Sequence, residues 1–214
     1  MDDAEHGENS SSPNVNITVT SVKKRAIGPF DRIELSDGSF FLIHPTFPPP
    51  FYYTEGINLS SDEIESLGSF SEIGYAWEKA VQLLERRNHS QQELKLKLRK
   101  KKFSGIAVDA VLERLVERNI LDDSIFAEHW ILSRLSRHPE GYYALLAGLL
   151  RKGVSGNIAK EVLEKVFTDE TALDAVKRVW EKGKRKGKSE AELEKLLEKR
   201  GFRRHLVRRF LYDE

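Results

Sequence analysis

The sequence has 214 residues, of which 39% are hydrophobic and 32% are charged, so it is rich in charge yet holds enough apolar side chains to fold. Cysteine is absent, which excludes disulfides, zinc–thiolate sites, iron–sulfur clusters and thiol catalysis. No apolar run approaches the roughly 18 residues of a membrane span, and the acidic N-terminus is unlike a signal peptide. We therefore expect a soluble, cytoplasmic protein.

The formal net charge of +1 hides an uneven distribution along the chain. Residues 1–73 carry 12 acidic and 4 basic side chains, whereas residues 74–214 carry 22 acidic and 31 basic side chains. A basic body with an acidic arm indicates an anionic partner for the body, or an arm that folds back on it. The alternative is an excess of basic residues scattered over solvated helix faces.

The N-terminal third is predicted to be a disordered tail followed by a small sheet. Residues 1–13 are polar and serine-rich, which predicts disorder. Within residues 14–70, apolar and polar residues first alternate with a period of two, and Asp37-Gly38 then separates two β-prone runs. We predict an antiparallel sheet over 15–44 with a type I′ turn at Asp37-Gly38. A proline-rich connector and a short helix, opened by a capping box at Ser60–Glu63, complete this part.

From residue 71 onward the hydrophobic pattern is helical and repeats three times. Relative to an apolar residue at Phe103, Val154 and Phe202, a leucine occurs nine and five positions earlier, and apolar residues occur four and eight positions later. A further amphipathic helix precedes each such pair. We therefore predict a mainly α fold of three tandem three-helix repeats in an elongated array, preceded by the small β segment. The predicted repeats are residues 71–119, 120–168 and 169–214.

Three motifs in this region together resemble the RecX family of bacterial regulatory proteins. They are AWEKAVQLLERRNHSQQELKLKL (Ala76–Leu98), ILDDSIFA (Ile120–Ala127), and the glycine and leucine pattern from Gly141 to Val154. The resemblance covers about residues 71–213, and the β-rich segment looks like the N-terminal extension of longer members. It implies a non-enzymatic, cytoplasmic modulator of the RecA recombinase. Relatives lie in the groove of the RecA filament on DNA and usually restrain its growth, ATP hydrolysis and strand exchange.

One segment departs from the pattern of the family. The middle helix of repeat two is basic in relatives, but Gly141–Leu150 here carries no charge. Ala144, Leu146 and Gly148 stand where the resemblance places two basic residues and a glutamate. Leu146 and Leu150 then form either extra core or an exposed apolar strip, which would favour contact with protein or self-association with a second copy of this chain.

Clusters of basic residues are the candidate binding sites. They are expected to contact the RecA filament and, weakly and in a salt-dependent way, the DNA backbone, because interspersed glutamates dilute the charge. A flexible basic linker over 182–188 adds further charge. The candidate residues are Lys95, Arg99, Lys102, Arg134, Arg137, Arg151, Lys152, Arg203, Arg204 and Arg208.

Other residues with chemical potential are better explained by structure. Asp122-Asp123 precedes an apolar helix and is expected to cap it rather than to act as a catalytic pair. Each repeat carries a tryptophan on its first helix, which favours a core position over base stacking. Phosphate-binding and nucleophile motifs are absent from the sequence, so we expect no enzyme, cofactor or metal. The alternative function is a helical-repeat adaptor for nucleic acid or protein whose role has drifted.

Overall fold

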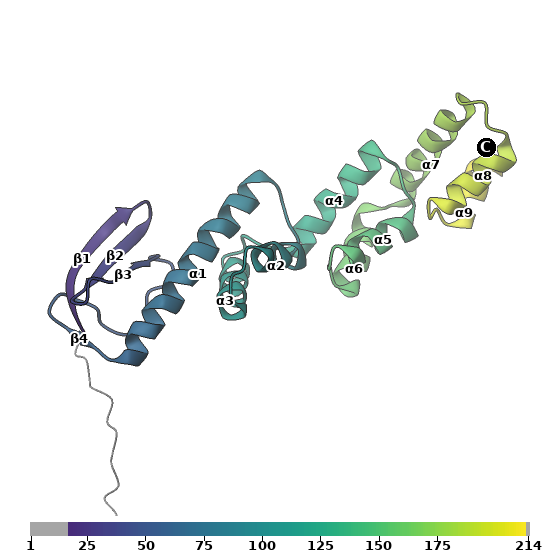
Figure 1. Ribbon diagram of the computed structural model, residues 1–214. Coiled ribbons are helices and arrows are strands. Elements are labelled where there is room, and N and C mark those ends of the chain that lie inside the picture. The colour runs from purple at the N-terminus through teal and green to yellow at the C-terminus, as the bar shows by residue number, and fades with distance from the viewer. Residues whose placement is uncertain (1–16, 213–214) are drawn as a thin grey trace, which may run out of the picture. The chain divides into compact units, whose positions relative to one another are not determined.

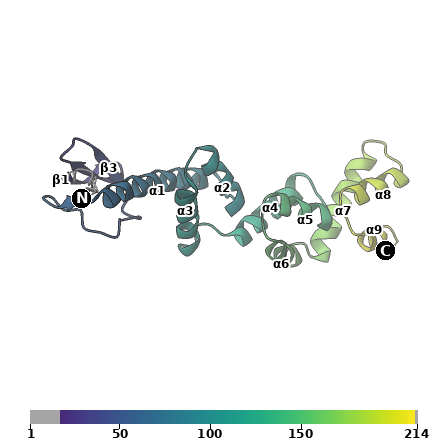
Figure 2. The ribbon, with the colours of Figure 1, turned by 60° about the horizontal axis from the view of Figure 1, so that its bottom comes forward.

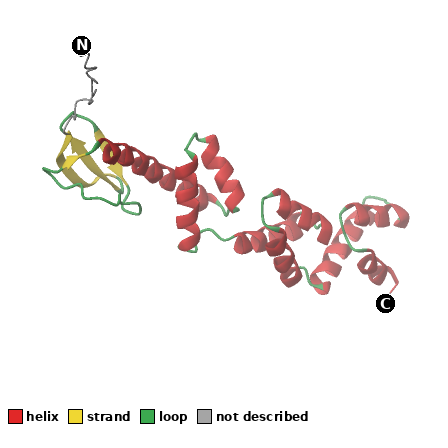
Figure 3. Cartoon of the chain, turned by 90° about the horizontal axis from the view of Figure 1, so that it is seen from below, coloured by secondary structure: helices red, strands yellow, loops and turns green. Residues whose placement is uncertain are grey.

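The computed structural model describes residues 17–212, and the tail predicted over 1–13 lies outside them. The chain divides into two compact units, Met1–Glu78 and Lys79–Glu214. Within the described residues, four strands precede nine helices (Figure 3). The strands are β1 (Ile17–Ile27), β2 (Phe30–Leu35), β3 (Phe40–Ile43) and β4 (Asn58–Leu59). The helices are α1 (Ser61–Arg86), α2 (Gln91–Lys100), α3 (Gly105–Glu117), α4 (Asp123–Arg137), α5 (Tyr142–Arg151), α6 (Gly156–Val166), α7 (Asp169–Lys184), α8 (Glu190–Lys199) and α9 (Arg204–Tyr212).

The four strands form one antiparallel sheet in the order β3-β2-β1-β4. Its apolar face buries Val19, Ile33, Ile43 and Leu59 against Leu67 of α1. The sheet confirms the predicted antiparallel β segment. β1 lies within the predicted range 15–44, whereas β4 lies outside it. The outer half of β1 is exposed and is held by backbone pairing with β2.

The chain reverses at Asp37-Gly38 as predicted, but the predicted turn type, I′, is wrong. Of the two residues, only Gly38 has a positive φ, at +86°. The Gly38 amide donates to the carbonyl of Leu35 (3.0 Å), and the Leu35 amide donates to the carbonyl of Ser39 (2.9 Å). This is a three-residue loop that ends on a left-handed glycine. The Asp37 carboxylate accepts the Ser39 amide (2.9 Å), which holds the aspartate inside the loop.

Helix α1 is longer than the sequence pattern indicated. Its start at the capping box is confirmed, since Ser60 and Glu63 exchange side-chain to backbone hydrogen bonds of 2.8 and 3.3 Å. However, the short helix and the first helix of repeat one, predicted separately, are a single helix that runs to Arg86. No proline or left-handed residue interrupts it. The domain boundary proposed after residue 70 therefore falls within α1.

The later helices pack in the predicted groups of three. Helices α4, α5 and α6 pack on one another, as do α7, α8 and α9, and α2 packs on α3 (Figures 1 and 2). Helices α4 to α9 also share one continuous apolar core. The six leucines that define the repeat are completely buried, namely Leu94, Leu98, Leu145, Leu149, Leu193 and Leu197.

Consecutive repeats are joined where one middle helix begins and the next middle helix ends. The Ser90 hydroxyl, at the N-cap of α2, donates to the carbonyl of Lys152 at the C-cap of α5 (2.5 Å). The Gly141 amide, at the N-cap of α5, donates to the carbonyl of Arg200 at the C-cap of α8 (2.8 Å). Helix N-termini carry unpaired donors and partial positive charge, and C-termini carry the opposite. Each of these helix-end joints therefore satisfies both partners.

The residue that follows the C-cap of each middle helix has a left-handed backbone. Whether this residue must be glycine depends on whether the preceding repeat packs against it. Lys102, Gly153 and Gly201 have φ of 69°, 80° and 80°. A Cβ at Gly153 would lie 2.3 Å from the Cβ of Gln92, and one at Gly201 would lie 2.5 Å from the amide nitrogen of Ala144. Glycine is thus required where the preceding repeat docks on the turn. Lys102 belongs to the first repeat, where no earlier middle helix docks on the turn, so a side chain is tolerated.

Helix α5 carries no charge before Arg151, and the residues that depart from the family pattern serve internal packing. A Cβ at Gly148 would lie 2.2 Å from the ring of Trp130, so glycine makes room for the indole. Ala144 contacts the turn at Gly201, and Leu146 is half-buried against the shared core. Leu150 is 48% exposed. The predicted apolar strip is therefore divided, because Leu146 belongs to the core and Leu150 faces solvent.

Replacing Gly201 tests the helix-end joint. Gly201→Ala should destabilise the protein by about 1–2 kcal/mol for the left-handed backbone and by about 1–3 kcal/mol more for the collision with Ala144. Gly187→Ala is the matched control, because Gly187 has a φ of +76° but open space around its Cβ position. Urea unfolding of both variants gives the comparison. Equal losses of stability would contradict the close approach at Gly201.

Restoring the acidic residue of the relatives tests the packing of α5. Gly148→Glu should displace Trp130 and lower the free energy of unfolding by about 3 kcal/mol or more, because a charge would be left in the core. Ala147→Glu is the control, since Ala147 is the exposed neighbour on the same helix. Tryptophan emission should shift to the red in the first variant only. Unchanged emission and stability in Gly148→Glu would show that α5 can present the relatives' residue to solvent.

Candidate protein and nucleic-acid interface

The basic stripe of repeat one is partly neutralised by the neighbouring helix. Lys95 of α2 forms an ion pair with Asp109 of α3 (2.8 Å). The hydrogen bond from Lys95, with the charges of Lys95 and Arg99, lowers the pKa of the Asp109 carboxyl. The Arg99 guanidinium lies over Gly105, where a Cβ would be 2.7 Å from its Nη2. Lys102 is exposed in the turn after α2. The stripe therefore presents Arg99 and Lys102 more freely than Lys95.

Two of the four candidate residues in repeat two serve structural ion pairs. Arg134 pairs with Glu140 (Nε to Oε2, 3.2 Å) and lies 5.7 Å from the ring centre of Trp130. Lys152 pairs with Glu93 of repeat one at 2.5 Å, beside the helix-end joint. Arg137 and Arg151 are exposed at the ends of α4 and α5. The predicted cluster is thus not one continuous surface of unpaired charge.

Glu93 forms two ion pairs beside the joint between repeats one and two. Its carboxylate pairs with Arg87 (2.9 Å) as well as with Lys152. Burial raises the pKa of Glu93, but the hydrogen bonds and charges of these two partners outweigh it, and the pKa lies below its ordinary value. Lys152 is therefore a structural cation that holds repeat two on repeat one.

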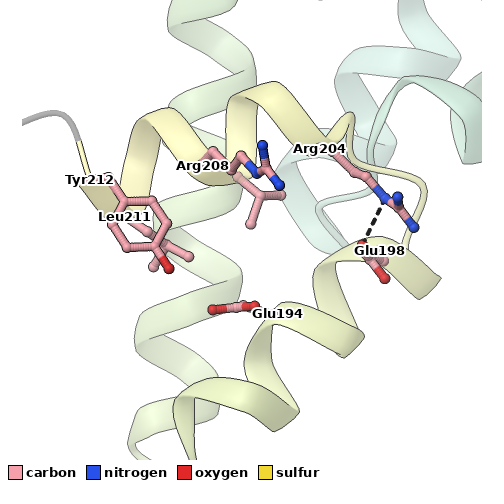
Figure 4. A pocket seen from close by; sticks show the side chains of 7 residues that line it. Glu194, Glu198, Arg204, Arg208, Leu211 and Tyr212 are labelled. Atoms are coloured by element: carbon pink, nitrogen blue, oxygen red, sulfur yellow. Dashed lines mark ion pairs between the residues drawn. The ribbon is translucent and has the colours of Figure 1, made fainter.

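The candidate arginines of repeat three lie among acidic side chains and aromatic rings. Arg203 stacks over the ring of Tyr142 at 4.0 Å from its centre. Arg204 pairs with Glu198 (3.0 Å), and both line a cavity of about 250 Å³ with Arg208 and Glu194 (Figure 4). This cavity contains both signs of charge, so it is poorly suited to hold an anion.

The structure adds two arginines that the sequence analysis missed. Arg178 of α7 donates to the carbonyls of Leu135 (3.0 Å) and Ser136 (2.6 Å) at the end of α4. Arg200 donates to the carbonyl of Pro139 (3.1 Å) in the loop that follows. These hydrogen bonds hold repeat three against the end of α4, where the candidate residue Arg137 lies. Arg200 had a signal in the sequence, because basic residues occupy the same repeat position at Lys101 and Lys152.

The two aspartates at the start of α4 both act as caps. Asp122 accepts the amides of Ser124 (2.6 Å) and Ile125 (3.3 Å), which confirms the predicted capping role. Asp123 is buried and accepts the amide of Gln91 (2.9 Å), the first residue of α2. Burial raises the pKa of the Asp123 carboxyl, despite this hydrogen bond. Asp123 thus gives the joint between repeats one and two a second contact.

His89 lies buried just before the N-cap of α2. Its Nδ1 lies 2.9 Å from the carbonyl of Arg87, and its Nε2 lies 2.7 Å from the ammonium of Lys97. These partners assign a proton to Nδ1 and a lone pair to Nε2, so the ring is neutral. Burial lowers the pKa of His89, and the charge of Arg87 lowers it further. The histidine has a structural role at the start of α2.

Over residues 17–212, no three His, Asp or Glu side chains gather closely enough to hold a metal ion. None of the helices in that range combines the length and apolar character that crossing a membrane requires. What the candidate residues offer chemically is positive charge.

Comparison with known proteins identifies relatives with the same organisation. Residues 76–115 match the model of the RecX first three-helix domain. The regulatory protein RecX of Chlorobium phaeobacteroides (strain BS1) is 38% identical over 139 residues, which cover 64% of this chain and 91% of that protein. The regulatory protein RecX of Treponema pallidum is 36% identical over 135 residues, which cover 63% of this chain and 82% of that protein.

Two solved structures share the fold. A crystal structure of regulatory protein RecX matches with a TM-score of 0.79 and 17% identity, over 92% of this chain and all of that one. The crystal structure of RecX from Lactobacillus salivarius matches with a TM-score of 0.57 and 17% identity, over 66% of this chain and 96% of that one. The sequence match to the Chlorobium protein, together with this fold, shows that the chain belongs to the RecX family of regulatory proteins.

Proposed function

We propose that this protein binds RecA filaments on DNA and restrains their ATPase and strand-exchange activities, without catalysing a reaction itself. The observation that carries the proposal is the 38% identity to a regulatory protein RecX across 91% of that relative. The relatives are named as regulatory rather than catalytic proteins. Regulation of this kind requires occupancy of a surface, for which charge and shape at helix ends are sufficient.

The arrangement of the repeats supports this mode of action. The joints fix each middle helix against the next one, so basic side chains on α2, α5 and α8 keep set positions along the repeats. Arg99, Lys102 and Arg151 are exposed, and such cations contact backbone phosphates without reading sequence. Binding through them depends strongly on salt.

Helix α5 makes a different contribution here than in the family pattern. The positions that match the basic residues of relatives pack against Gly201 and the shared core. Two large side chains of α5 remain outside, since Tyr143 is 59% exposed and Leu150 is 48% exposed. We propose that repeats one and three supply the charge, and that repeat two offers an apolar contact to RecA or to a second copy of this chain.

The test is the DNA-dependent ATPase of RecA. The protein should inhibit it at substoichiometric ratios to RecA. The variant Lys95→Glu/Arg99→Glu/Lys102→Glu should inhibit at least about tenfold less strongly, and its inhibition should depend less on salt, since fewer counterions are released. The matched control is Lys160→Glu/Lys177→Glu/Lys199→Glu, which reverses three exposed lysines outside the candidate sites.

Two results would contradict the proposal. Equal losses in the two variants would show that net charge, rather than the stripe on α2, decides binding. A wild-type protein that binds DNA or protein but leaves the RecA ATPase unchanged would favour a helical-repeat adaptor, the alternative that the altered helix α5 keeps open.

A further inference from the structure

A second cavity, of about 190 Å³, lies where the end of α4 meets α7 and α8. Every charged side chain that lines it is basic. This distinguishes it from the cavity of Figure 4, which contains Glu194 and Glu198. The basic lining residues are Arg137, Arg178, Lys182, Lys186, Lys188 and Arg200.

Backbone carbonyls hold the two arginines in place. Arg178 donates to two carbonyls at the end of α4, and Arg200 donates to the carbonyl of Pro139. A guanidinium has five N–H donors, so each arginine keeps donors for a ligand. Holding them in advance reduces the side-chain entropy that binding would otherwise cost. The remaining lining residues are His138, Pro139, Val179, Gly183 and Leu196.

Lys182 lies in α7, and Lys186 and Lys188 belong to the ordered turn that follows it, which corrects the flexible linker expected from the sequence. The amides of Lys186 and Lys188 both donate to the carbonyl of Gly183 (3.0 and 3.2 Å). Gly187 supplies the left-handed residue of the turn, with a φ of +76°. Helix α7 and this turn therefore keep Lys182, Lys186 and Lys188 beside the arginines.

Nearby acidic groups leave most of this charge uncompensated. Asp174 lies 3.8 Å from Arg178, but its side chain is 65% exposed and outside the cavity. Glu190 pairs with Lys184, which does not line the cavity. An enclosed surface with one sign of charge concentrates counterions of the other sign. The charge of its lining therefore suits the cavity to an anion.

We propose that this cavity binds phosphate groups of the DNA backbone, and so makes repeat three a DNA contact. Its volume equals that of about six waters at roughly 30 Å³ each, which suits a phosphate with solvent around it. Its lining holds six cationic side chains but a single aromatic ring, that of His138, so it favours the phosphates of the backbone over stacked bases. The exposed lysines at its edge can follow a chain of phosphates. The inference rests on the proposed function, which places the protein on a DNA-bound filament.

The experiment measures binding of a fluorescent single-stranded oligonucleotide to the full-length protein by anisotropy, between about 50 and about 200 mM salt. Lys182→Gln/Lys186→Gln/Lys188→Gln should weaken binding at least tenfold at the lower salt, and should reduce the slope of log K against log salt by about 2. Lys160→Gln/Lys177→Gln/Lys199→Gln removes the same charge elsewhere and should leave the slope unchanged. We expect both variants to remain folded, because the substituted lysines are exposed or half-buried, and thermal unfolding checks this.

Wild-type affinity and slope in the cavity variant would overturn the inference, as would a wild-type protein with no affinity for the oligonucleotide. Two competition arms identify the source of the anion. If tripolyphosphate or a poly-glutamate peptide binds in a cavity-dependent way while the oligonucleotide does not, DNA is the wrong ligand.

Parallel assays of the RecA ATPase separate this inference from the proposed function. If wild-type protein restrains the ATPase but the cavity variant binds DNA normally, only the inference fails. If wild-type protein leaves the ATPase unchanged, the proposed function fails, and the oligonucleotide assay still decides whether the cavity binds DNA.

Discussion

The N-terminus of each of the first two middle helices meets the C-terminus of the next middle helix. Ser90 and Gly141 donate to the carbonyls of Lys152 and Arg200, and the left-handed glycines after those carbonyls allow the backbones to approach. A typical hydrogen bond of this kind adds about 0.5–1.5 kcal/mol, and the complementary helix dipoles add to it. Because an N-cap residue contacts the C-cap carbonyl of the next middle helix in both joints, these contacts fix how one repeat follows the next.

The helix-end joints also occupy some of the basic residues, so that fewer of them are available to bind a partner. They use Lys152 in an ion pair with Glu93, and they use the backbone of Arg200, whose side chain then reaches the loop at Pro139. In α5 the joint and the core occupy the positions that are charged in the family pattern. The basic side chains that remain exposed include Arg99 and Lys102 at the end of α2, and Lys182 and Lys186 of the cavity beside α7 and α8.

Much of the fold could be predicted from the sequence, because local patterns encode it. The leucine spacing predicted the repeats, and Asp37-Gly38 predicted the chain reversal. The basic cavity could not be predicted, because Arg178 and Arg200 reach backbone carbonyls some 40 and 60 residues away, and such contacts leave no periodic signal. The packing of Gly148 beneath Trp130 was missed for the same reason. Of the candidate residues, Lys95, Arg134, Lys152 and Arg204 proved to be ion-paired, since a sequence shows charge but not its nearest partner.

Amide hydrogen exchange at Gly141 tests whether the helix-end joints hold the repeats together. The Gly141 amide is the N-cap donor of α5, and its partner is the Arg200 carbonyl of the next repeat. An N-cap amide has no acceptor within its own helix, so any protection must come from repeat three. If the joint is formed, the Gly141 amide should exchange nearly as slowly as the core amide of Leu145. Exchange at the rate of an open, unprotected amide would contradict this expectation.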